Sequence, residues 1–227
     1  MMHALVVGAS PEPGGRPFYR ELLGRADLVV AADAGSEWCV GLGLVPHLAV
    51  GDFDSAALGA AERLRAAGTR VLEHPRAKDD SDLDLAVAAA LAQGASSITL
   101  CACFGGRLDH TLASLGTLVR AAESAAADVQ EPSFAVWAVE GPSRPSIGLS
   151  MEPGATFSVF AVGETSGVVV EGGTFRLEGG VLPPLSSLGL SNVASHSRVS
   201  VSVAAGSVVV IAQVTRGARR AALITAP

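Results

Sequence analysis

The feature that most constrains the fold is an alternation, over residues 1–141, of short apolar runs with longer stretches rich in Ala and Leu. Such alternation is typical of βαβ units, in which helices join the strands of a parallel sheet. The predicted strands are Ala4–Val7, Leu28–Ala32, His47–Val50, Arg70–Leu72, Ser97–Ala102 and Phe134–Val139. The predicted helices are Phe18–Leu23, Ser36–Leu42, Ala56–Ala67, Asp82–Gln93 and His110–Ala122, and residues Ala121–Ala127 are expected to form a helix end or a loop. We therefore expect an α/β domain, doubly wound and mostly parallel.

The pattern changes after the segment Gly141-Pro142-Ser143-Arg144-Pro145. Short apolar runs follow, separated by Gly, Pro and Ser turns, which is typical of a small all-β domain, a sandwich or a barrel. These runs are Thr156–Val162, Val168–Glu171, Val199–Val203 and Val208–Ala212. The sequence thus predicts two domains, 1–141 and 142–227.

Charge and composition exclude several classes of partner. The 16 basic and 22 acidic side chains give a formal net charge of -6, which argues against nucleic acid as a partner. The first residues lack the basic and apolar regions of a leader, and no apolar run approaches the roughly 20 residues that span a bilayer, so we expect a cytoplasmic protein with no membrane partner. The three cysteines, Cys39, Cys101 and Cys103, lack the paired spacing of a zinc site and are predicted to be core thiols.

Acidic side chains follow successive strands of the first domain. Because the carboxyl ends of parallel strands meet at one edge of a sheet, these carboxylates are expected to converge there. Like charges held together repel unless cations neutralise them, and oxygen-only ligands favour magnesium, which usually accompanies phosphates. The residues concerned are Asp33, Asp52, Asp54, Asp79, Asp82 and Asp109.

Each of these features also has a purely structural interpretation. Asp33 alone is more often a helix cap or a turn former, and the charged run Lys78–Asp84 could be a solvated helix start with Ser81 as its N-cap. Asp52 and Asp54 are a stronger signal, since two carboxylates at a spacing of two on an extended segment point the same way. The segment Gly105–Arg107 joins a flexible Gly pair to an Arg whose guanidinium is suited to binding phosphate. Neither a Walker motif nor G-x-G-x-x-G is present, so by motif the chain is neither a P-loop kinase nor a dinucleotide-binding dehydrogenase.

Taken in order, four segments of the first domain resemble the motif series of thiamine pyrophosphokinases. Two segments of the second domain, Gly172–Leu177 and Gly189–Asn192, are similar to that family's aromatic hairpin and Gly-x-Ser-Asn segment. Three residues depart from those that are common in the family at these places: Ala34 in the first domain, and Arg176 and Val193 in the second. The four segments are Ala32–Gly35, Gly51–Ser55, Lys78–Asp82 and Gly106–His110.

The resemblance implies transfer of the diphosphate of ATP to the hydroxyethyl oxygen of thiamine, with AMP leaving, in a homodimer whose thiamine site lies between subunits. It implies Mg²⁺ as cofactor, held by Asp52, Asp54 and Asp82. The implied catalytic set adds Asp33 and Asp109, the ATP contacts are Lys78, Asp79, Ser81, Gly106 and Arg107, and the thiamine contacts are Phe175, Ser191 and Asn192.

Three other functions remain open at this stage. A related pyrophosphokinase could use another hydroxyalkyl heterocycle, such as a pterin. A nucleotide- or thiamine-binding sensor would need no turnover, and a metal-dependent phosphohydrolase would need no acceptor. Products formed with and without each acceptor separate all of these from thiamine diphosphate synthesis.

Overall fold

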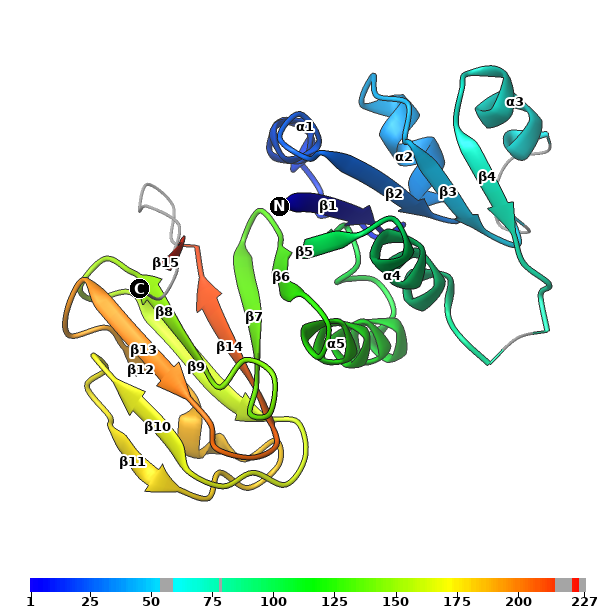
Figure 1. Cartoon of the computed structure of the whole chain (residues 1–227). Coiled ribbons are helices and arrows are strands. Elements are labelled where there is room, and N and C mark those ends of the chain that lie inside the picture. Colours follow the sequence, from blue (N-terminus) through cyan, green and yellow to red (C-terminus); the bar gives the residue numbers. More distant parts are fainter. Residues whose placement is uncertain (54–58, 78, 215–221, 225–227) are drawn as a thin grey trace. The chain divides into compact units, whose positions relative to one another are not determined.

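The computed structural model describes residues 1–53, 59–77, 79–214 and 222–224. The chain forms two compact units, Met1–Pro132 and Ser133–Pro227 (Figure 1). The division precedes strand β7 (Phe134–Glu140), which the sequence analysis assigned to the first domain, because β7 pairs with β14 (Ser207–Gln213) of the second unit. The proline-rich segment at 141–145 is a turn inside that unit, closed by the backbone of Arg144 donating to Glu140 O at 2.7 Å.

Six strands of the first unit pair in parallel, in the order β6-β5-β1-β2-β3-β4. Their bounds are β1 Met2–Val7, β2 Leu28–Ala32, β3 Leu48–Gly51, β4 Arg70–Glu73, β5 Ala95–Cys101 and β6 Ala126–Gln130. The helices are α1 Arg16–Leu23, α2 Gly35–Gly41, α3 Ala60–Ala66, α4 Asp82–Ala92 and α5 Leu108–Ala122. Five predicted strands and the helices at these places are thereby confirmed, with ends that differ by a few residues.

Both faces of the parallel sheet are buried. Leu5 and Val7 of β1 belong to one apolar cluster with residues of α1 and α2, while their neighbours Ala4 and Val6 are equally buried and face the other side. Helix α4 contacts β1, β2, β3 and β5. A sheet buried on both sides explains the near-continuous apolar runs that predicted it, and the doubly wound fold is confirmed.

The cysteines lie in this interior, as predicted. Cys39, Cys101 and Cys103 are buried and free. Burial raises the pKa of all three thiols, that of Cys39 to about 12. They are therefore protonated, unreactive core side chains at neutral pH.

Strand β6 was not predicted. The sequence analysis placed a helix end or loop at Ala121–Ala127, whereas α5 ends at Ala122 and β6 begins at Ala126. The strand carries Asp128, whose carboxylate accepts hydrogen bonds from Thr99 and from Gln130, each at 2.6 Å. The bond from Thr99 crosses from β5, the strand with which β6 pairs. Polar residues alternate with the buried Ala127 and Val129 along β6 in place of an apolar run, so its sequence lacks the usual strand signal.

The second unit consists of two antiparallel sheets with the strand orders β12-β9-β14-β7 and β11-β10-β13-β8-β15. One buried apolar cluster takes residues from both sheets, among them Phe157 and Leu149, which confirms the sandwich. Besides β7 and β14, the elements of the second unit are β8 Ser146–Ser150, β9 Thr156–Ala161, β10 Val168–Glu171, β11 Leu177–Gly180, η1 Ser187–Gly189, β12 Asn192–Val193, β13 Arg198–Ser202 and β15 Ala222–Ile224. In the part of the chain that the structure describes, no helix is long and apolar enough to cross a bilayer.

Candidate functional site

A cavity of the first unit, called the main cavity below, lies at the carboxyl ends of the parallel strands, where the direction of strand succession reverses. The chain proceeds from β1 to β4 on one side of β1 and then places β5 on its other side. Open α/β sheets bind ligands at such a point. The cavity encloses about 420 Å³ and is lined by Gly8, Ala9, Ser10, Ala32, Asp33, Asp52, Arg76, Asp80, Ser81, Asp82, Leu83, Cys103, His110, Ala113 and Ser114.

The backbone turns sharply where three of these strands end. Asp33 after β2, Phe53 after β3 and Ala102 after β5 have positive φ angles of 47°, 55° and 52°. Residues other than glycine adopt this conformation at a cost of about 1–3 kcal/mol, and such strain is concentrated at functional sites. A Cβ at Gly8 would lie 2.6 Å from the carbonyl oxygen of Ala102, so the chain after β1 runs against the chain after β5.

Asp33 is placed by the turn between β2 and α2. Its N–H donates to Val50 O at 2.8 Å, and its carbonyl accepts from the hydroxyl of Ser36 at 2.7 Å. Ala34, not Asp33, is the N-cap of α2. Of the two structural interpretations of Asp33, the helix cap is therefore wrong, whereas the turn is confirmed. Its side chain lines the cavity with Oδ1 buried.

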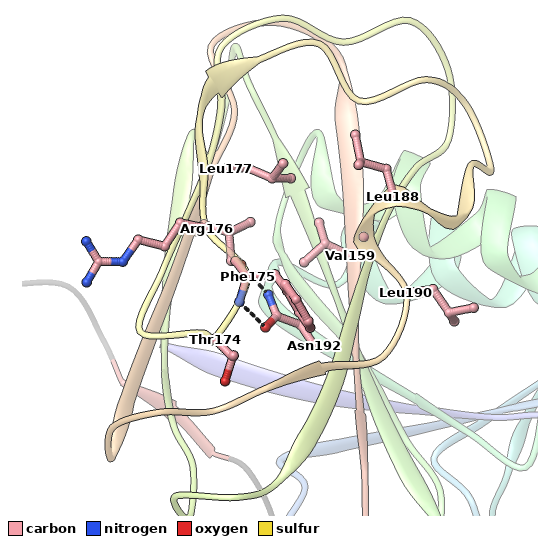
Figure 2. Close-up of a pocket in the computed structure, with 10 residues that line it drawn as sticks. Val159, Thr174, Phe175, Arg176, Leu177, Leu188, Leu190 and Asn192 are labelled. Carbon is pink, nitrogen blue, oxygen red and sulfur yellow. Dashed lines mark hydrogen bonds between the residues drawn. The ribbon is translucent and has the colours of Figure 1, made fainter.

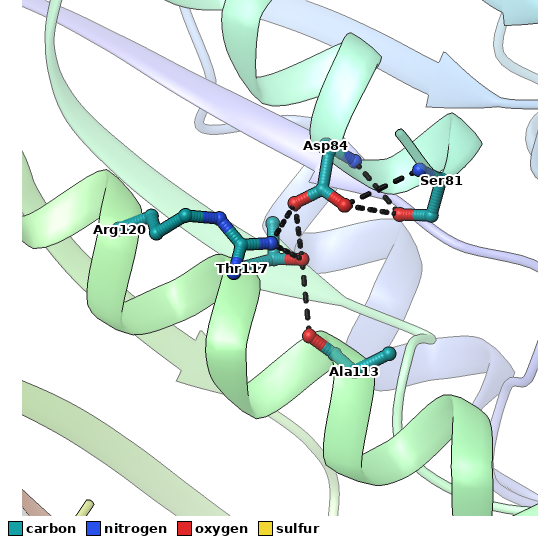
Figure 3. Close-up of polar contacts among 5 residues, drawn as sticks. All are labelled: Ser81, Asp84, Ala113, Thr117 and Arg120. Carbon is teal, nitrogen blue, oxygen red and sulfur yellow. Dashed lines mark hydrogen bonds and ion pairs between the residues drawn. The ribbon is translucent and has the colours of Figure 1, made fainter. Parts of the chain in front are cut away.

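Two residues at the start of α4, Ser81 and Asp82, line the same cavity. Ser81 is the N-cap, as predicted, and forms a capping box with Asp84. Asp84 also accepts a hydrogen bond from Thr117 Oγ1 at 2.6 Å and forms an ion pair with Arg120, both on α5 (Figure 3). These contacts tie the start of α4 to α5.

Asp84 remains ionised in this arrangement. Burial acts to raise the pKa of Asp84, but hydrogen bonds from Thr117, Ser81 and Arg120 outweigh it and lower the pKa below its usual value. A permanently charged acceptor keeps Ser81 and Asp82 in a fixed place relative to the cavity wall.

Arg107 and Asp109 bind each other at the start of α5. Arg107 donates from Nε and NH2 to the two carboxylate oxygens of Asp109, at 3.1 and 2.6 Å. The pKa of Asp109 is lowered to about 2, chiefly by the hydrogen bond from Arg107. Their side chains are 70% and 64% exposed and are not among the residues that line the cavity, so the predicted ATP contact of Arg107 and the predicted catalytic role of Asp109 stay predictions.

The cavity brings together part of the predicted acidic set. Asp33, Asp52 and Asp82 line it, whereas Asp79 is exposed and does not. Asp54 and Lys78 lie outside the described residues. Within the described ranges, no group of three or more His, Cys, Asp or Glu side chains is arranged to hold a metal ion.

Several lining residues were missed from the sequence. Arg76 brings a cation to the cavity, Asp80 brings a further carboxylate, and Ser10 and Ser114 bring hydroxyls. A signal was present for both Arg76 and Asp80, since Arg76 precedes the charged run after the fourth strand and Asp80 lies within it. Ser114 lies within α5, where no local pattern distinguishes it from an ordinary helix residue.

A second cavity, of about 360 Å³, lies within the second unit (Figure 2). Phe175, of the predicted thiamine contacts, lines it with a side chain that is 64% exposed, and Asn192 lines it with a buried one. Ser191 is absent from the lining and has a positive φ of 57°. The remaining lining residues are Val159, Val170, Thr174, Arg176, Leu177, Leu188, Gly189 and Leu190.

The amide of Asn192 is bonded to the hairpin that carries Phe175. Its Oδ1 accepts from the N–H groups of Phe175 at 3.0 Å and Val193 at 2.9 Å, and its Nδ2 donates to Phe175 O at 2.6 Å. Figure 2 shows the two bonds between Asn192 and Phe175 among the residues that line the cavity. Asn192 thus holds Phe175 at the cavity.

Comparison with known proteins agrees with this architecture. Residues 19–129 match the family model described as thiamin pyrophosphokinase, catalytic domain. A thiamine pyrophosphokinase from Bacillus subtilis (strain 168) is 31% identical over 110 residues, which are 47% of this chain and 51% of that relative. The matched region thus spans about half the length of the curated relative.

Solved structures share the fold over almost the whole chain. The thiamine pyrophosphokinase structure from Bacillus subtilis has a TM-score of 0.75 at 23% identity and covers 94% of this chain and 99% of its own. A thiamin pyrophosphokinase family protein from Enterococcus faecalis has a TM-score of 0.76 at 21% identity, with coverages of 95% and 100%. The structure of thiamin pyrophosphokinase from Candida albicans has a TM-score of 0.76 at 14% identity, with coverages of 94% and 89%.

Proposed function

Because this chain belongs to the thiamin pyrophosphokinase family, we propose that it transfers the diphosphate of ATP to the hydroxyethyl oxygen of thiamine, giving thiamine diphosphate and AMP. The observation that carries the proposal is the cavity at the strand ends, which gathers Asp33, Asp52 and Asp82 within the region matched to the catalytic domain. Phosphoryl-group transfer depends on positioning and charge neutralisation more than on covalent chemistry, and such a cavity suits it.

We assign the nucleotide and Mg²⁺ to this cavity. Magnesium is commonly bound by one or two carboxylates together with phosphate oxygens and water, and Asp52 and Asp82 are two such donors in one cavity. Asp54 is the third proposed ligand. When bound, the ion neutralises phosphate charge, while Asp33 is proposed to act nearby, with Asp109, in orienting the attacking hydroxyl.

The proposed phosphate contacts come from two helix starts. Ser81 lies at the start of α4, whose position is fixed by the bonds of Asp84 to α5. Gly106 and Arg107 precede α5, and Arg107 would exchange its partner Asp109 for phosphate. Lys78 and Asp79 complete the proposed set.

We assign the thiamine heterocycle to the cavity of the second unit. Its lining is mainly apolar, and Phe175 offers an aromatic face at the rim, so a flat heterocycle fits it. Asn192 fixes the hairpin that presents this ring, and Ser191 is proposed to contact the pyrimidine. We propose a homodimer in which the thiamine site lies between subunits, as the resemblance implies.

The test is a reaction of the full chain with ATP, Mg²⁺ and thiamine, in which AMP, ADP and thiamine diphosphate are resolved by chromatography. Equal amounts of AMP and thiamine diphosphate, with neither formed when metal or acceptor is left out, are expected. AMP formed with a pterin alcohol but not with thiamine would show that the acceptor is a pterin. Phosphate released without any acceptor would indicate a hydrolase. ATP binding without any product would indicate a sensor.

A matched pair of variants makes the test specific to the cavity. Asp33 and Asp27 lie at opposite ends of β2, and Asp27 accepts a hydrogen bond from the backbone of His3 at 2.9 Å. Asp33→Asn is expected to reduce kcat by at least about 100-fold, the order of magnitude of general acid–base contributions. Asp27→Asn keeps an acceptor oxygen at the far edge and should retain normal turnover. Equal activity of the two variants would refute the assignment of the cavity.

A further inference from the structure

Glu131 is a buried carboxylate just beyond β6, outside every motif of the sequence. Its side chain is 0% exposed. Oε2 accepts a hydrogen bond from the hydroxyl of Tyr19 at 2.5 Å, and Oε1 accepts from the N–H of Cys103 at 3.1 Å. The N–H of Phe104 is a further donor to this carboxylate. A buried carboxylate with three donors is an organised feature of the fold, because an unpaired one would be very costly.

The two backbone donors lead directly into the Gly-Gly-Arg loop at 105–107. The same loop is held at two other points: Ser114 donates to Cys103 O at 3.0 Å, and the N–H of Gly105 donates to Thr111 Oγ1 at 3.2 Å. Both of these contacts come from α5. Glu131 adds contacts from the end of β6 to the N–H groups of Cys103 and Phe104, so it helps to fix how the chain leaves β5.

We propose that Glu131 is a positioning residue for the nucleotide, which fixes the backbone of Cys103 and Phe104 and thereby sets the loop that meets the phosphates of ATP. The inference rests on the proposed function of that loop. Glu131 itself touches neither the cavity nor any proposed ligand, and it acts through hydrogen bonds to the main chain. A loop held before ligand arrives loses less conformational entropy on binding phosphate.

The charge of Glu131 is adjustable near neutral pH. Burial is the largest cause that raises its pKa, to about 7, and nearby Glu12 acts in the same direction, while the bonds from Tyr19 and from the backbone act against it. The other titratable groups that face it are Tyr19, Cys101 and Cys103, whose pKa values are raised by burial, so they stay protonated. A protonated Glu131 has fewer acceptor sites for its three donors, which loosens the loop.

The experiment measures the dissociation constant of ATP by titration calorimetry with Mg²⁺ and without acceptor, from pH 6 to 8.5, for the full chain and three variants. Glu131→Gln removes the charge and one acceptor oxygen at constant size. Tyr19→Phe removes the donor to Oε2 and leaves the bond from Cys103 to Oε1 in place. Glu140→Gln is the matched control, a buried carboxylate of the second unit that accepts from the backbone of Ser143 at 2.9 Å.

At pH 8, Glu131→Gln is expected to weaken ATP binding about fivefold, the order expected for one lost hydrogen bond. The KM of thiamine should be unchanged, and Glu140→Gln should bind ATP as the wild type does. Wild-type ATP affinity for Glu131→Gln at pH 8 would overturn the inference.

The pH dependence of the ATP dissociation constant separates positioning by the Glu131 carboxylate from a merely structural role, which would not change it. Relative to Glu131→Gln, the affinity of the wild type for ATP should fall as the pH falls through about 7, and the titration of ATP itself cancels in that comparison. Tyr19→Phe removes a bond that lowers the pKa of Glu131, so its midpoint should shift to higher pH. If Glu131→Gln does not fold, an unshifted midpoint in Tyr19→Phe still overturns the inference.

The outcome for the inference is separable from that for the proposed function. If the wild-type chain binds ATP but forms no thiamine diphosphate, the proposed acceptor reaction is wrong. The role of Glu131 in ATP binding is then tested by the dissociation constants alone. Wild-type chain that does not bind ATP overturns both.

Discussion

Gly35→Ala is expected to destabilise the first unit and to displace Asp33 from the cavity. Gly35 is the first residue of α2 and is buried against the end of β1. A Cβ added there would lie 2.4 Å from Val7 O and 2.7 Å from Gly8 O. Both neighbours are backbone atoms of a central strand and its exit, so they cannot rotate away as a flexible side chain would.

The magnitude follows from two opposing contributions. Overpacking of a close contact costs about 1–3 kcal/mol, and contacts this short lie toward the upper end. Alanine is preferred over glycine inside a helix by about 1 kcal/mol, less at the first position. The net loss of unfolding free energy for Gly35→Ala is thus about 2 kcal/mol. The same helix supplies the control, since a Cβ at Gly41 meets nothing within 4 Å, and Gly41→Ala should be neutral or slightly stabilising.

Trp38 provides the assay, because it lies on α2 itself with its ring 6.0 Å from that of Tyr19. Urea unfolding followed by Trp38 fluorescence, in a Trp137→Phe background shared by all proteins, gives the stability of the first unit for wild type, Gly35→Ala and Gly41→Ala. The affinity for ATP is measured on the same samples. Gly35→Ala should be less stable than Gly41→Ala and should bind ATP more weakly.

Equal stability of Gly35→Ala and Gly41→Ala would refute the close approach of α2 to β1. Loss of stability with unchanged ATP affinity would retain the packing argument but refute the coupling of this contact to Asp33.

Three further predictions follow from single contacts. The pKa of Glu131 is raised by burial from 4.5 to about 7, so the folded chain holds a proton that the unfolded chain has lost, and stability should fall by about 3 kcal/mol as the pH rises through this window. Urea titrations of Glu131→Gln should lack that fall, and an unchanged pH dependence would contradict it. Asn192→Ala removes the bonds that hold Phe175 and should raise the KM of thiamine with that of ATP unchanged, whereas equal effects on both would count against the second cavity. Thr117→Val removes the hydroxyl that donates to Asp84 and should cost about 1 kcal/mol in urea unfolding and raise the KM of ATP; no change in either would show that the α4 to α5 tie is unimportant.

The parallel sheet and the position of the main cavity were predictable because both follow from local patterns. Apolar runs fix the strands, and because these strands run parallel to one another, all of their carboxyl ends lie at one edge of the sheet. Asp33, Asp52 and Asp82 therefore share a cavity although they are far apart in sequence. A residue directly after a strand can be assigned to that edge without knowledge of its partners.

Contacts that depend on distant segments were not predictable in the same way. Glu131 follows a strand whose sequence is too polar to be recognised, and its partner Tyr19 belongs to the first helix. The expected boundary at 141–142 differs from the observed division after Pro132, because Phe134–Glu140 pairs with a strand near the end of the chain. In both cases the deciding partner is distant in the sequence: Glu140 of β7 pairs with Ser207, and Tyr19 is separated from Glu131 by 112 residues.

Asn192 shows why a motif does not by itself assign a role. Resemblance places it among the residues that contact thiamine, and the structure places it at the second cavity with its amide bonded to the backbone of Phe175 and Val193. The same asparagine is needed under either role, because removing those bonds would release the aromatic ring from the rim. A substitution that lowers acceptor affinity therefore does not distinguish contact from positioning. Asn192→Asp tests the donor, since it retains the oxygen that accepts from both N–H groups and places a charged oxygen against Phe175 O, where the amide had donated at 2.6 Å.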